Sequence, residues 1–342
     1  MSASLIAITP GDPAGIGPEI VAKAFRDAPD LLRGCFVAGD IAVMRRGAAC
    51  TTGADRASLP VSQIMSPAEA WHSPPRCVPV LQVVPALMPD RLPAFSRVQS
   101  AAGAHAAATV RWAANAALRG DVAAMVTAPL HKAALAAAGE TFPGHTELLQ
   151  AEAAAFLGRS VSEVPVRMML ANPELRTVLV SIHLSLRQAI DAVTRTNVLQ
   201  TLHITHAALS AVLRRPPRIA VAGLNPHAGE EGLFGLEERD AIAPAVAEAQ
   251  AAGLQVSGPY APDTVFMRAR QGEFDVVVAM YHDQGLIPVK YLGVEQGVNV
   301  TLGLPLVRTS PDHGTAFDIA GTGTADAASL IAAVQMARAM CA

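Results

Sequence analysis

Short apolar segments alternate with longer alanine- and leucine-rich segments along most of this 342-residue chain. The short segments have the length of buried strands, and the longer ones repeat their apolar residues at the period of a helix. Such alternation predicts an α/β fold in which helices cover a largely parallel sheet. We expect strands at Leu5–Thr9, Cys35–Ala38, Val78–Val84, Ala123–Thr127, Val166–Leu170, Thr177–Ser181, Ile219–Gly223, Val276–Met280 and Val298–Thr301.

Clear helical patterns cover Pro18–Asp27, Ser100–Arg119, Arg187–Leu213 and Glu237–Ala252. Gly253 follows the last of these, at the position where a left-handed residue commonly ends a helix. The stretch from Cys50 to Arg97 is rich in proline, serine and charge and contains one good strand, so we expect an irregular surface segment. The chain is also long enough for two lobes, because single hydrophobic cores stop growing below this size.

Composition and charge exclude several classes of protein. The chain is 51% apolar and 16% charged, but no uninterrupted apolar run is long enough to span a membrane. A net charge of −3 and few aromatic residues disfavour nucleic-acid binding. The N-terminus lacks the basic region of a signal peptide, and the four cysteines are scattered, so we expect a cytoplasmic protein without disulfides. The class of protein that remains is one that acts on small molecules.

Three histidines each follow a predicted strand and lie within a turn-rich motif. They are His183, His227 in Asn225–Gly229, and His282 in Tyr281–Gly285. Ligands of open α/β enzymes bind beyond the carboxyl ends of the strands, where neutral imidazoles suit a divalent metal. We therefore expect a catalytic metal site. His203 and His206 also share a helix face, but they lack an acidic or cysteine partner nearby, so we interpret them as part of a partly exposed helix face.

Two cations lie in otherwise apolar segments, where an unpaired charge would be costly. They are Lys290 and Arg308, which flank Asn299, and a substrate phosphate or carboxylate would satisfy them. His145 and Thr146 add donors at a predicted helix start, although Thr146 could simply be an N-cap. Neither the Rossmann glycine fingerprint nor a P-loop is present, which disfavours both of those nucleotide sites.

Several motifs resemble one family along nearly the whole chain. The segments Gly11–Glu19 and His313–Gly321 look like those of the isocitrate/isopropylmalate dehydrogenase superfamily, which binds NAD without a Rossmann fingerprint. More closely, the chain resembles the 4-hydroxythreonine-4-phosphate dehydrogenases of pyridoxal phosphate biosynthesis. The matching motifs are Thr127–Lys132, Gly144–Glu147, Gly223–Glu230, Asp263–Thr264, Tyr281–Gly285 and Gly297–Pro305.

The resemblance implies a three-layer α/β/α fold with two lobes. Residues 1–130 and 303–342 would form the cofactor-side lobe, and residues 131–302 the lobe for metal, substrate and dimerisation. A homodimer would have its active site at the subunit interface, with metal ligands drawn from both chains. The implied metal ligands are His183, His227 and His282, and the implied substrate contacts are His145, Thr146, Lys290, Asn299 and Arg308. The cofactor would contact Gly11, Asp12, His313, Gly314 and Asp318.

The same resemblance implies that 4-phosphooxy-L-threonine is oxidised at its 3-hydroxyl by NAD or NADP and then loses CO2. A bound Zn²⁺, Mg²⁺ or Co²⁺ would lower the pKa of the hydroxyl. Asp263 and Asp283 are candidate proton acceptors or orienters of the metal ligands, and Lys290 is a candidate proton donor. The residues do not decide which of the three acts.

Some residues depart from the family pattern, namely Glu295-Gln296 before Gly297, and Ala128 where glycine also occurs. Relatives that act on 4-phosphorylated threonate or erythronate, or on aromatic cis-diols, would retain the histidines and the cofactor loop. The first of these is the main alternative. A metal-dependent hydrolase without nicotinamide and a non-catalytic metal-binding protein are more remote ones.

Overall fold

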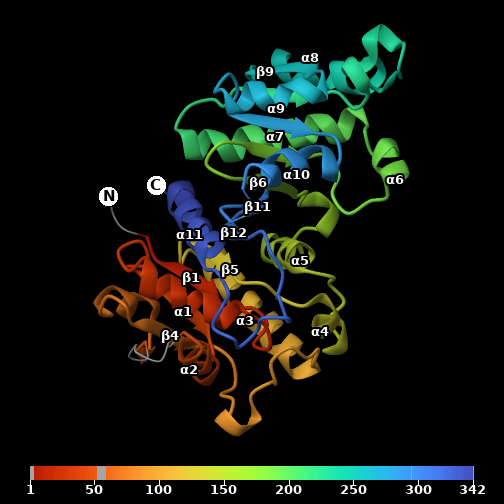
Figure 1. Ribbon diagram of the computed structural model, residues 1–342. Helices are drawn as coiled ribbons and strands as arrows, with labels where there is room; N and C mark the ends of the chain where they lie inside the picture. Colours follow the sequence, from red (N-terminus) through yellow and green to blue (C-terminus); the bar gives the residue numbers. More distant parts are fainter. Residues whose placement is uncertain (1–3, 52–58, 294, 342) are drawn as a thin grey trace. The chain divides into compact units, whose positions relative to one another are not determined.

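The computed structural model describes residues 4–51, 59–293 and 295–341, and it divides the chain into two compact units (Figure 1). Unit 1 consists of Met1–Pro165 and Leu304–Ala342, and unit 2 of Val166–Gly303. The lobe boundaries predicted from the sequence therefore differ at one end. Residues 131–165, which we expected in the second lobe, belong to unit 1. Their helices α4 (Lys132–Ala137) and α5 (His145–Leu157) pack on α3 (Ser100–Leu118).

The strands of unit 1 form a parallel array in the order β3-β4-β2-β1-β5-β12. Strands β1, β2 and β5 are buried at every position, as expected of a parallel sheet covered on both faces. The bounds are β1 Ile6–Thr9, β2 Cys35–Gly39, β3 Val61–Ile64, β4 Val78–Gln82, β5 Ala124–Thr127 and β12 Val307–Pro311.

Helices cover the sheet of unit 1. One group contains α1, α2 and α11, in which α1 packs on the other two, and a second group contains α3, α4 and α5. The bounds are α1 Gly17–Asp27, α2 Ile41–Ala49, α3 Ser100–Leu118, α4 Lys132–Ala137, α5 His145–Leu157 and α11 Ala328–Cys341, with short 3-10 turns η1 Pro67–His72, η2 Pro89–Arg91 and η3 Val161–Glu163.

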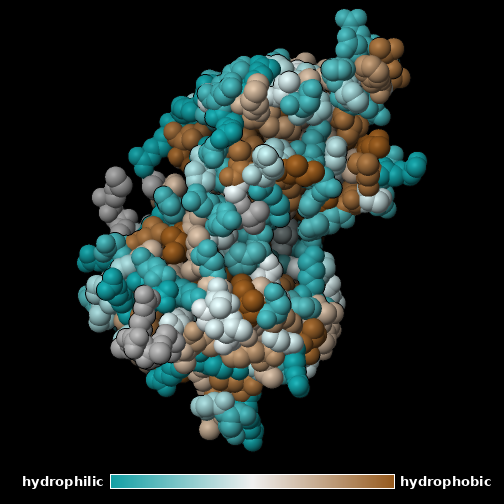
Figure 2. All heavy atoms as spheres, in the orientation of Figure 1, coloured by the Kyte–Doolittle hydropathy of each residue, from teal (hydrophilic) through white to brown (hydrophobic). Residues whose placement is uncertain are grey.

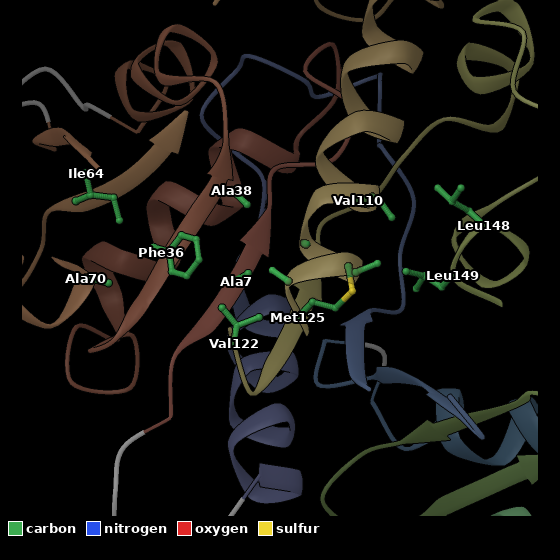
Figure 3. Close-up of a cluster of buried hydrophobic side chains, with 13 residues drawn as sticks. Ala7, Phe36, Ala38, Ile64, Ala70, Val110, Val122, Met125, Leu148 and Leu149 are labelled. Carbon is green, nitrogen blue, oxygen red and sulfur yellow. The ribbon is translucent and has the colours of Figure 1, made fainter. Parts of the chain in front are cut away.

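A hydrophobic core joins the sheet of unit 1 to α3 and α5 (Figure 3). Phe36 of β2 and Met125 of β5 contribute large, fully buried side chains, and Leu148 and Leu149 reach the core from the first turns of α5. Burial of these residues orients the start of α5, which carries His145.

The strands of unit 2 lie in the order β11-β6-β7-β10-β8-β9. Strands β7, β10, β8 and β9 are parallel, whereas β6 is antiparallel to both β7 and β11. Asn172 makes the turn between β6 and β7, because its side-chain oxygen accepts hydrogen bonds from the backbone of Glu174 and Leu175. The bounds are β6 Arg167–Ala171, β7 Arg176–Leu179, β8 Ile219–Ala222, β9 Val256–Tyr260, β10 Val276–Ala279 and β11 Val298–Leu302.

The helices of unit 2 also pack on its sheet, with α9 and α10 burying Phe266 and Val289 in one hydrophobic cluster. Their bounds are α6 Leu186–Asp191, α7 Arg195–Leu213, α8 Ala243–Ala251, α9 Pro262–Arg270 and α10 His282–Tyr291, with a 3-10 segment η4 Pro226–Gly232 and a π-helical turn η5 Glu238–Ile242. In the part of the chain that the structure describes, no helix has the length and apolarity to cross a membrane.

The α/β class and all of the strands predicted from the sequence are confirmed, and Gly253 has the expected positive φ of 87°. Strands β3, β9 and β12 were missed. Strand β3 lies in the segment from Cys50 to Arg97 that we expected to be mostly irregular, of which residues 52–58 lie outside the described part. The single helix predicted over Arg187–Leu213 is wrong, because Thr194 starts α7 as an N-cap.

Candidate active site

The three predicted histidines follow neighbouring strands of unit 2. His183 follows β7, His227 follows β8, and His282 is the first residue of α10, after β10. Strand β10 pairs in parallel with both β7 and β8. Their carboxyl ends therefore lie at one edge of the sheet, which is where the sequence placed a ligand site.

His183 and His282 lie side by side, with ring centroids 5.9 Å apart. Both line a hollow of about 460 Å³, together with Tyr281 and Asp283. The Nδ1 atom of His282 is 2.7 Å from Oδ1 of Asp283, so this carboxylate fixes the orientation of the ring. Two imidazoles and a carboxylate thus face the same hollow.

His227 lines a second hollow of about 770 Å³, which also includes Asp263 and shares Tyr281 and Asp283 with the first. Its backbone has a φ of +50°, within a segment of unusual conformation. Asp263 is exposed in the first turn of α9. The two predicted aspartates therefore do lie beside the predicted histidines.

The three histidines do not form a closed metal site. Over residues 4–51, 59–293 and 295–341, no group of three or more His, Cys, Asp or Glu side chains is arranged to hold a metal ion. The donors themselves suit a divalent transition metal, and the structure brings two of the three imidazoles together. A metal site built from His183, His227 and His282 thus stays a prediction.

Gln284 also lies at this edge of the sheet, and the sequence analysis assigns it no role. Its Oε1 accepts a hydrogen bond from the backbone of Met280 at 2.7 Å, and its Nε2 donates to the backbone oxygen of Gly223, also at 2.7 Å. The side chain therefore ties the loop before His282 to the end of the strand before His227. Its position inside the motif Tyr281–Gly285 was the feature of the sequence from which a role could have been predicted.

Two further predicted residues of unit 2 lie on regular elements. Lys290 is half-buried in the last turn of α10, and Asn299 is half-buried in β11, opposite Leu170 of β6. Neither residue lines the two hollows described above.

Arg308 is buried in unit 1, where only 3% of its surface is exposed. Its guanidinium donates two hydrogen bonds to the Thr127 hydroxyl, from Nε at 3.1 Å and from Nη2 at 2.7 Å. Burial lowers the pKa of Arg308 to about 10, an effect that the nearby Glu147 opposes. A buried guanidinium, with several N–H donors in a fixed planar arrangement, is suited to bind an anionic group.

His145 begins α5 and lies close enough to Arg308 for their charges to interact. Burial lowers the pKa of His145 well below its ordinary value, and the positive charge of Arg308 lowers it further. Among the described residues, its buried Nε2 atom has no hydrogen-bond partner. Thr146 lies in the same first turn, but Gly144 is the N-cap, so the N-cap role considered for Thr146 is wrong.

The two segments expected to bind the cofactor lie against each other in unit 1. The backbone N–H of Ile16 donates to the oxygen of Thr315 at 3.0 Å, and a Cβ atom on Gly15 would lie only 2.9 Å from the Thr315 side chain. Gly11 has a φ of +70°, and a Cβ atom there would lie 2.1 Å from the backbone oxygen of Pro129. These glycines are therefore required for three loops to meet.

Asp12 is fully buried within this loop cluster. Its Oδ1 accepts a hydrogen bond from Ala14 N at 2.8 Å, whereas Oδ2 has no partner among the described residues. Burial raises the pKa of Asp12, while the Ala14 hydrogen bond and the charge of His131 oppose the shift. His131, which we had not assigned, stacks on Phe317 at a centroid distance of 4.7 Å. Its buried Nδ1 also has no partner in the described chain.

The remaining predicted cofactor residues lie in the loop after β12. His313 Nδ1 is 3.1 Å from the backbone oxygen of Gly314, and its buried Nε2 has no partner within the described ranges. Gly314 and Asp318 are exposed. Buried polar atoms are nearly always hydrogen-bonded in folded proteins, so the unsatisfied atoms of Asp12, His131 and His313 fit a polar ligand at these loops.

The chain resembles known proteins over nearly its full length. A family model described as "Pyridoxal phosphate biosynthetic protein PdxA" matches residues 32–337. A 4-hydroxythreonine-4-phosphate dehydrogenase from Beijerinckia indica is 50% identical, covering 95% of this chain and 91% of the relative. A D-threonate 4-phosphate dehydrogenase from Salmonella typhimurium is 45% identical, covering 98% and 99%. The crystal structure of a 4-hydroxythreonine-4-phosphate dehydrogenase from Klebsiella pneumoniae superimposes with a TM-score of 0.87 at 42% identity, covering 99% and 98%.

Proposed function

Because the chain belongs to the pyridoxal phosphate biosynthetic protein PdxA family, we propose that it is an NAD(P)-dependent and metal-dependent dehydrogenase of 4-phosphooxy-L-threonine. In this reaction the substrate would be oxidised at C3, with NAD(P) as the two-electron acceptor, and the 3-hydroxyl would lose its proton. The 3-oxo acid then loses CO2 and takes up a proton at C2, yielding 3-amino-2-oxopropyl phosphate. The observation that carries the proposal is the near full-length similarity to a relative that bears this activity's name.

Arg308 is the residue best suited to hold the substrate's phosphate or carboxylate. It is a buried cation that already donates two hydrogen bonds to Thr127, and the neutral His145 beside it has an unsatisfied ring nitrogen among the described residues. An anion bound there would offset the cost of burying the charge and raise the lowered pKa of His145. Thr146, Lys290 and Asn299 remain further proposed contacts.

The nicotinamide cofactor is proposed to bind at the loops that contain Gly11, Asp12, His313, Gly314 and Asp318. Unsatisfied buried atoms of Asp12 and His313 within the described chain, together with glycines that allow backbone contact, support this location. The cofactor would supply the hydride acceptor, and the part of these loop residues would be to orient it.

His183, His227 and His282 would hold the divalent ion, which supplies Lewis-acid stabilisation of negative charge on the substrate oxygen. Asp283 orients the His282 ring through its 2.7 Å contact. Asp263 lies on the same hollow as His227, where it could accept a proton, and Lys290 is the proposed donor of the proton that C2 takes up. Zn²⁺, Co²⁺ and Mg²⁺ are all candidates for the ion.

The second candidate is oxidation of 4-phospho-D-threonate or erythronate. It is favoured by the 45% identity to the D-threonate 4-phosphate dehydrogenase across 98% of this chain. The two substrates differ at C2, where one carries an ammonium group and the other a hydroxyl group.

The test is NAD(P)H formation from 4-phosphooxy-L-threonine and from 4-phospho-D-threonate, each with and without a metal chelator. We expect turnover of the amino acid that the chelator abolishes. Faster turnover of 4-phospho-D-threonate would favour the second candidate function. Turnover that survives exhaustive chelation would contradict the metal-dependent mechanism. If neither substrate gives NAD(P)H, both assignments are contradicted.

We also propose that the enzyme is a homodimer and that the partner chain completes the metal site. Large apolar side chains are exposed on unit 2, and apolar areas are visible on the molecular surface (Figure 2). Such exposure is typical of a surface that a partner covers. The exposed residues are Leu184, Leu186, Ile190, Leu233, Phe234, Leu236, Met267, Ile287 and Tyr291. A cytoplasmic location is proposed as well, and it agrees with the four free cysteines.

A further inference from the structure

The loop that contains His227 has a backbone conformation that needs external support. His227, Ala228, Gly229, Glu230 and Glu231 have φ values of 50°, 53°, 83°, 43° and 55°. Left-handed backbone is strained for a residue that has a Cβ atom, and four of these five residues have one. Such a run persists only where the surrounding structure over-determines it.

Glu238, at the start of the π-helical turn η5, supplies hydrogen bonds to the beginning of this loop. Only 5% of its surface is exposed. Its Oε1 accepts from the backbone N–H groups of Leu224 and Asn225, both at 2.7 Å, and its Oε2 accepts from Asn225 Nδ2 at 2.9 Å. One carboxylate therefore holds two successive backbone groups and one side chain immediately before Pro226 and His227.

Glycines leave the space that this carboxylate occupies. A Cβ atom on Gly223 would lie 3.1 Å from Glu238 Oε1, and one on Gly229 would lie 2.7 Å from Oε2. Likewise, a Cβ atom on Gly235 would lie 2.3 Å from Asn225 Nδ2. The carboxylate thus contacts the loop both before and after His227, at positions where a larger residue would displace it.

We propose that Glu238 is a positioning residue, which holds the left-handed loop so that His227 is presented to its hollow. Glu238 does not line that hollow, and its oxygens are already engaged by the loop, so it acts through His227 rather than on the substrate. The inference rests on the proposed function, because it takes His227 to be a metal ligand. Residues that orient a metal ligand typically change metal affinity by about 10- to 100-fold when they are replaced.

The experiment measures Co²⁺ binding to the full-length protein by titration calorimetry, without substrate or cofactor. We expect Glu238→Ala to weaken Co²⁺ binding by about 10- to 100-fold. Glu238→Gln should weaken it less, because its amide oxygen can still accept from both backbone groups while its NH₂ group faces Asn225 Nδ2. Glu237→Gln is the matched control. Glu237 also accepts a hydrogen bond from Asn225 Nδ2, at 2.7 Å, but its side chain is half-buried, whereas that of Glu238 is buried.

Two comparisons separate the failure of this inference from that of the proposed function. If His227→Ala binds Co²⁺ like the unaltered protein, the proposed ligand set is wrong. If His227→Ala loses Co²⁺ but Glu238→Ala and Glu238→Gln bind it normally, the positioning role is wrong. If a thermal unfolding control shows that Glu238→Ala does not fold, the Glu238→Gln variant decides the question. Weaker Co²⁺ binding by Glu238→Gln than by Glu237→Gln would support the positioning role. Equal Co²⁺ binding by the two variants would overturn it.

Discussion

Buried polar atoms define the chemistry of this protein at the scale of single residues. Arg308 and His145 lie close enough for their charges to interact, and burial lowers the pKa of both side chains. Asp12 shows the opposite shift, because burial disfavours its negative charge and raises its pKa. Buried ionisable groups with shifted pKa values often lie at functional sites, which makes these side chains candidates for contact with a charged ligand.

We predict that Arg308→Ala raises KM for the phosphorylated substrate by roughly 10- to 100-fold, the effect of losing a charged hydrogen bond. An unphosphorylated analogue should lose much less, and steady-state kinetics on both substrates would measure the difference. Arg119→Ala serves as a control, because Arg119 is exposed and pairs with Asp121 at the surface. An equal loss with both substrates would contradict the role of Arg308 in binding the phosphate.

The buried His105 should make the free energy of unfolding depend on pH. Burial lowers its pKa to about 4, so the unfolded state takes up a proton on this residue at a higher pH than the folded state does. Stability should therefore fall as the pH decreases below the ordinary histidine pKa, by about 2 kcal/mol between pH 7 and pH 5. Urea unfolding of His105→Leu should show a fall that is smaller by that amount. An unchanged pH dependence in this variant would exclude His105 as the cause.

At the scale of elements, close backbone approach decides the roles of several glycines. Gly103 lies within α3, where a Cβ atom would be 2.0 Å from the backbone oxygen of Ala134 in α4. The same logic applies to the loops around Gly11 and Gly15, and to the loop that Glu238 holds. Glycine is present in these places because another backbone occupies the space of a side chain.

Gly103→Ala tests this conclusion, because helix propensity and packing predict opposite signs. Propensity alone would stabilise α3 by about 1 kcal/mol, whereas forcing α4 away from α3 costs about 1–3 kcal/mol. We expect net destabilisation in urea unfolding. The exposed Ala104→Gly in the same helix is the matched control and should lose about 1 kcal/mol by propensity. Stabilisation by Gly103→Ala would show that α4 moves freely.

At the scale of the whole molecule, the property to test is the oligomeric state. Unit 2 exposes Leu186 and Leu233, with 61% and 73% of their surfaces accessible, whereas the described chain does not close a three-ligand metal site. In the proposed homodimer, a second chain would cover apolar surface of unit 2 and bring its own ligands to the metal site.

We predict that light scattering gives twice the chain mass of 35.4 kDa. Leu186→Glu should shift the mass toward that of one chain and weaken Co²⁺ binding at the same time, because both depend on the partner. Met65→Glu, at an exposed methionine of unit 1, is the control and should change neither. A monomeric unaltered protein that binds Co²⁺ tightly would contradict the shared site.

Local patterns in the sequence determined the elements and the chemistry at their ends. Buried parallel strands are continuous apolar runs, so β1, β5, β8 and β10 could be read directly, and the turn residues after them indicated the histidine loops. Strand β12 was missed because its polar sequence Val-Arg-Thr-Ser-Pro looks like a loop. It becomes a strand through pairing with β5, which is far away in the sequence.

Tertiary structure decided what depends on contacts between distant segments. The chain order could not show that Arg308 donates to Thr127, that His131 stacks on Phe317, or that Glu238 holds the loop of His227. Nor could it assign α4 and α5 to unit 1, which follows from their packing on α3. The sequence thus determined which groups end each strand, because that information is local, whereas the fold determined their partners, burial and pKa values.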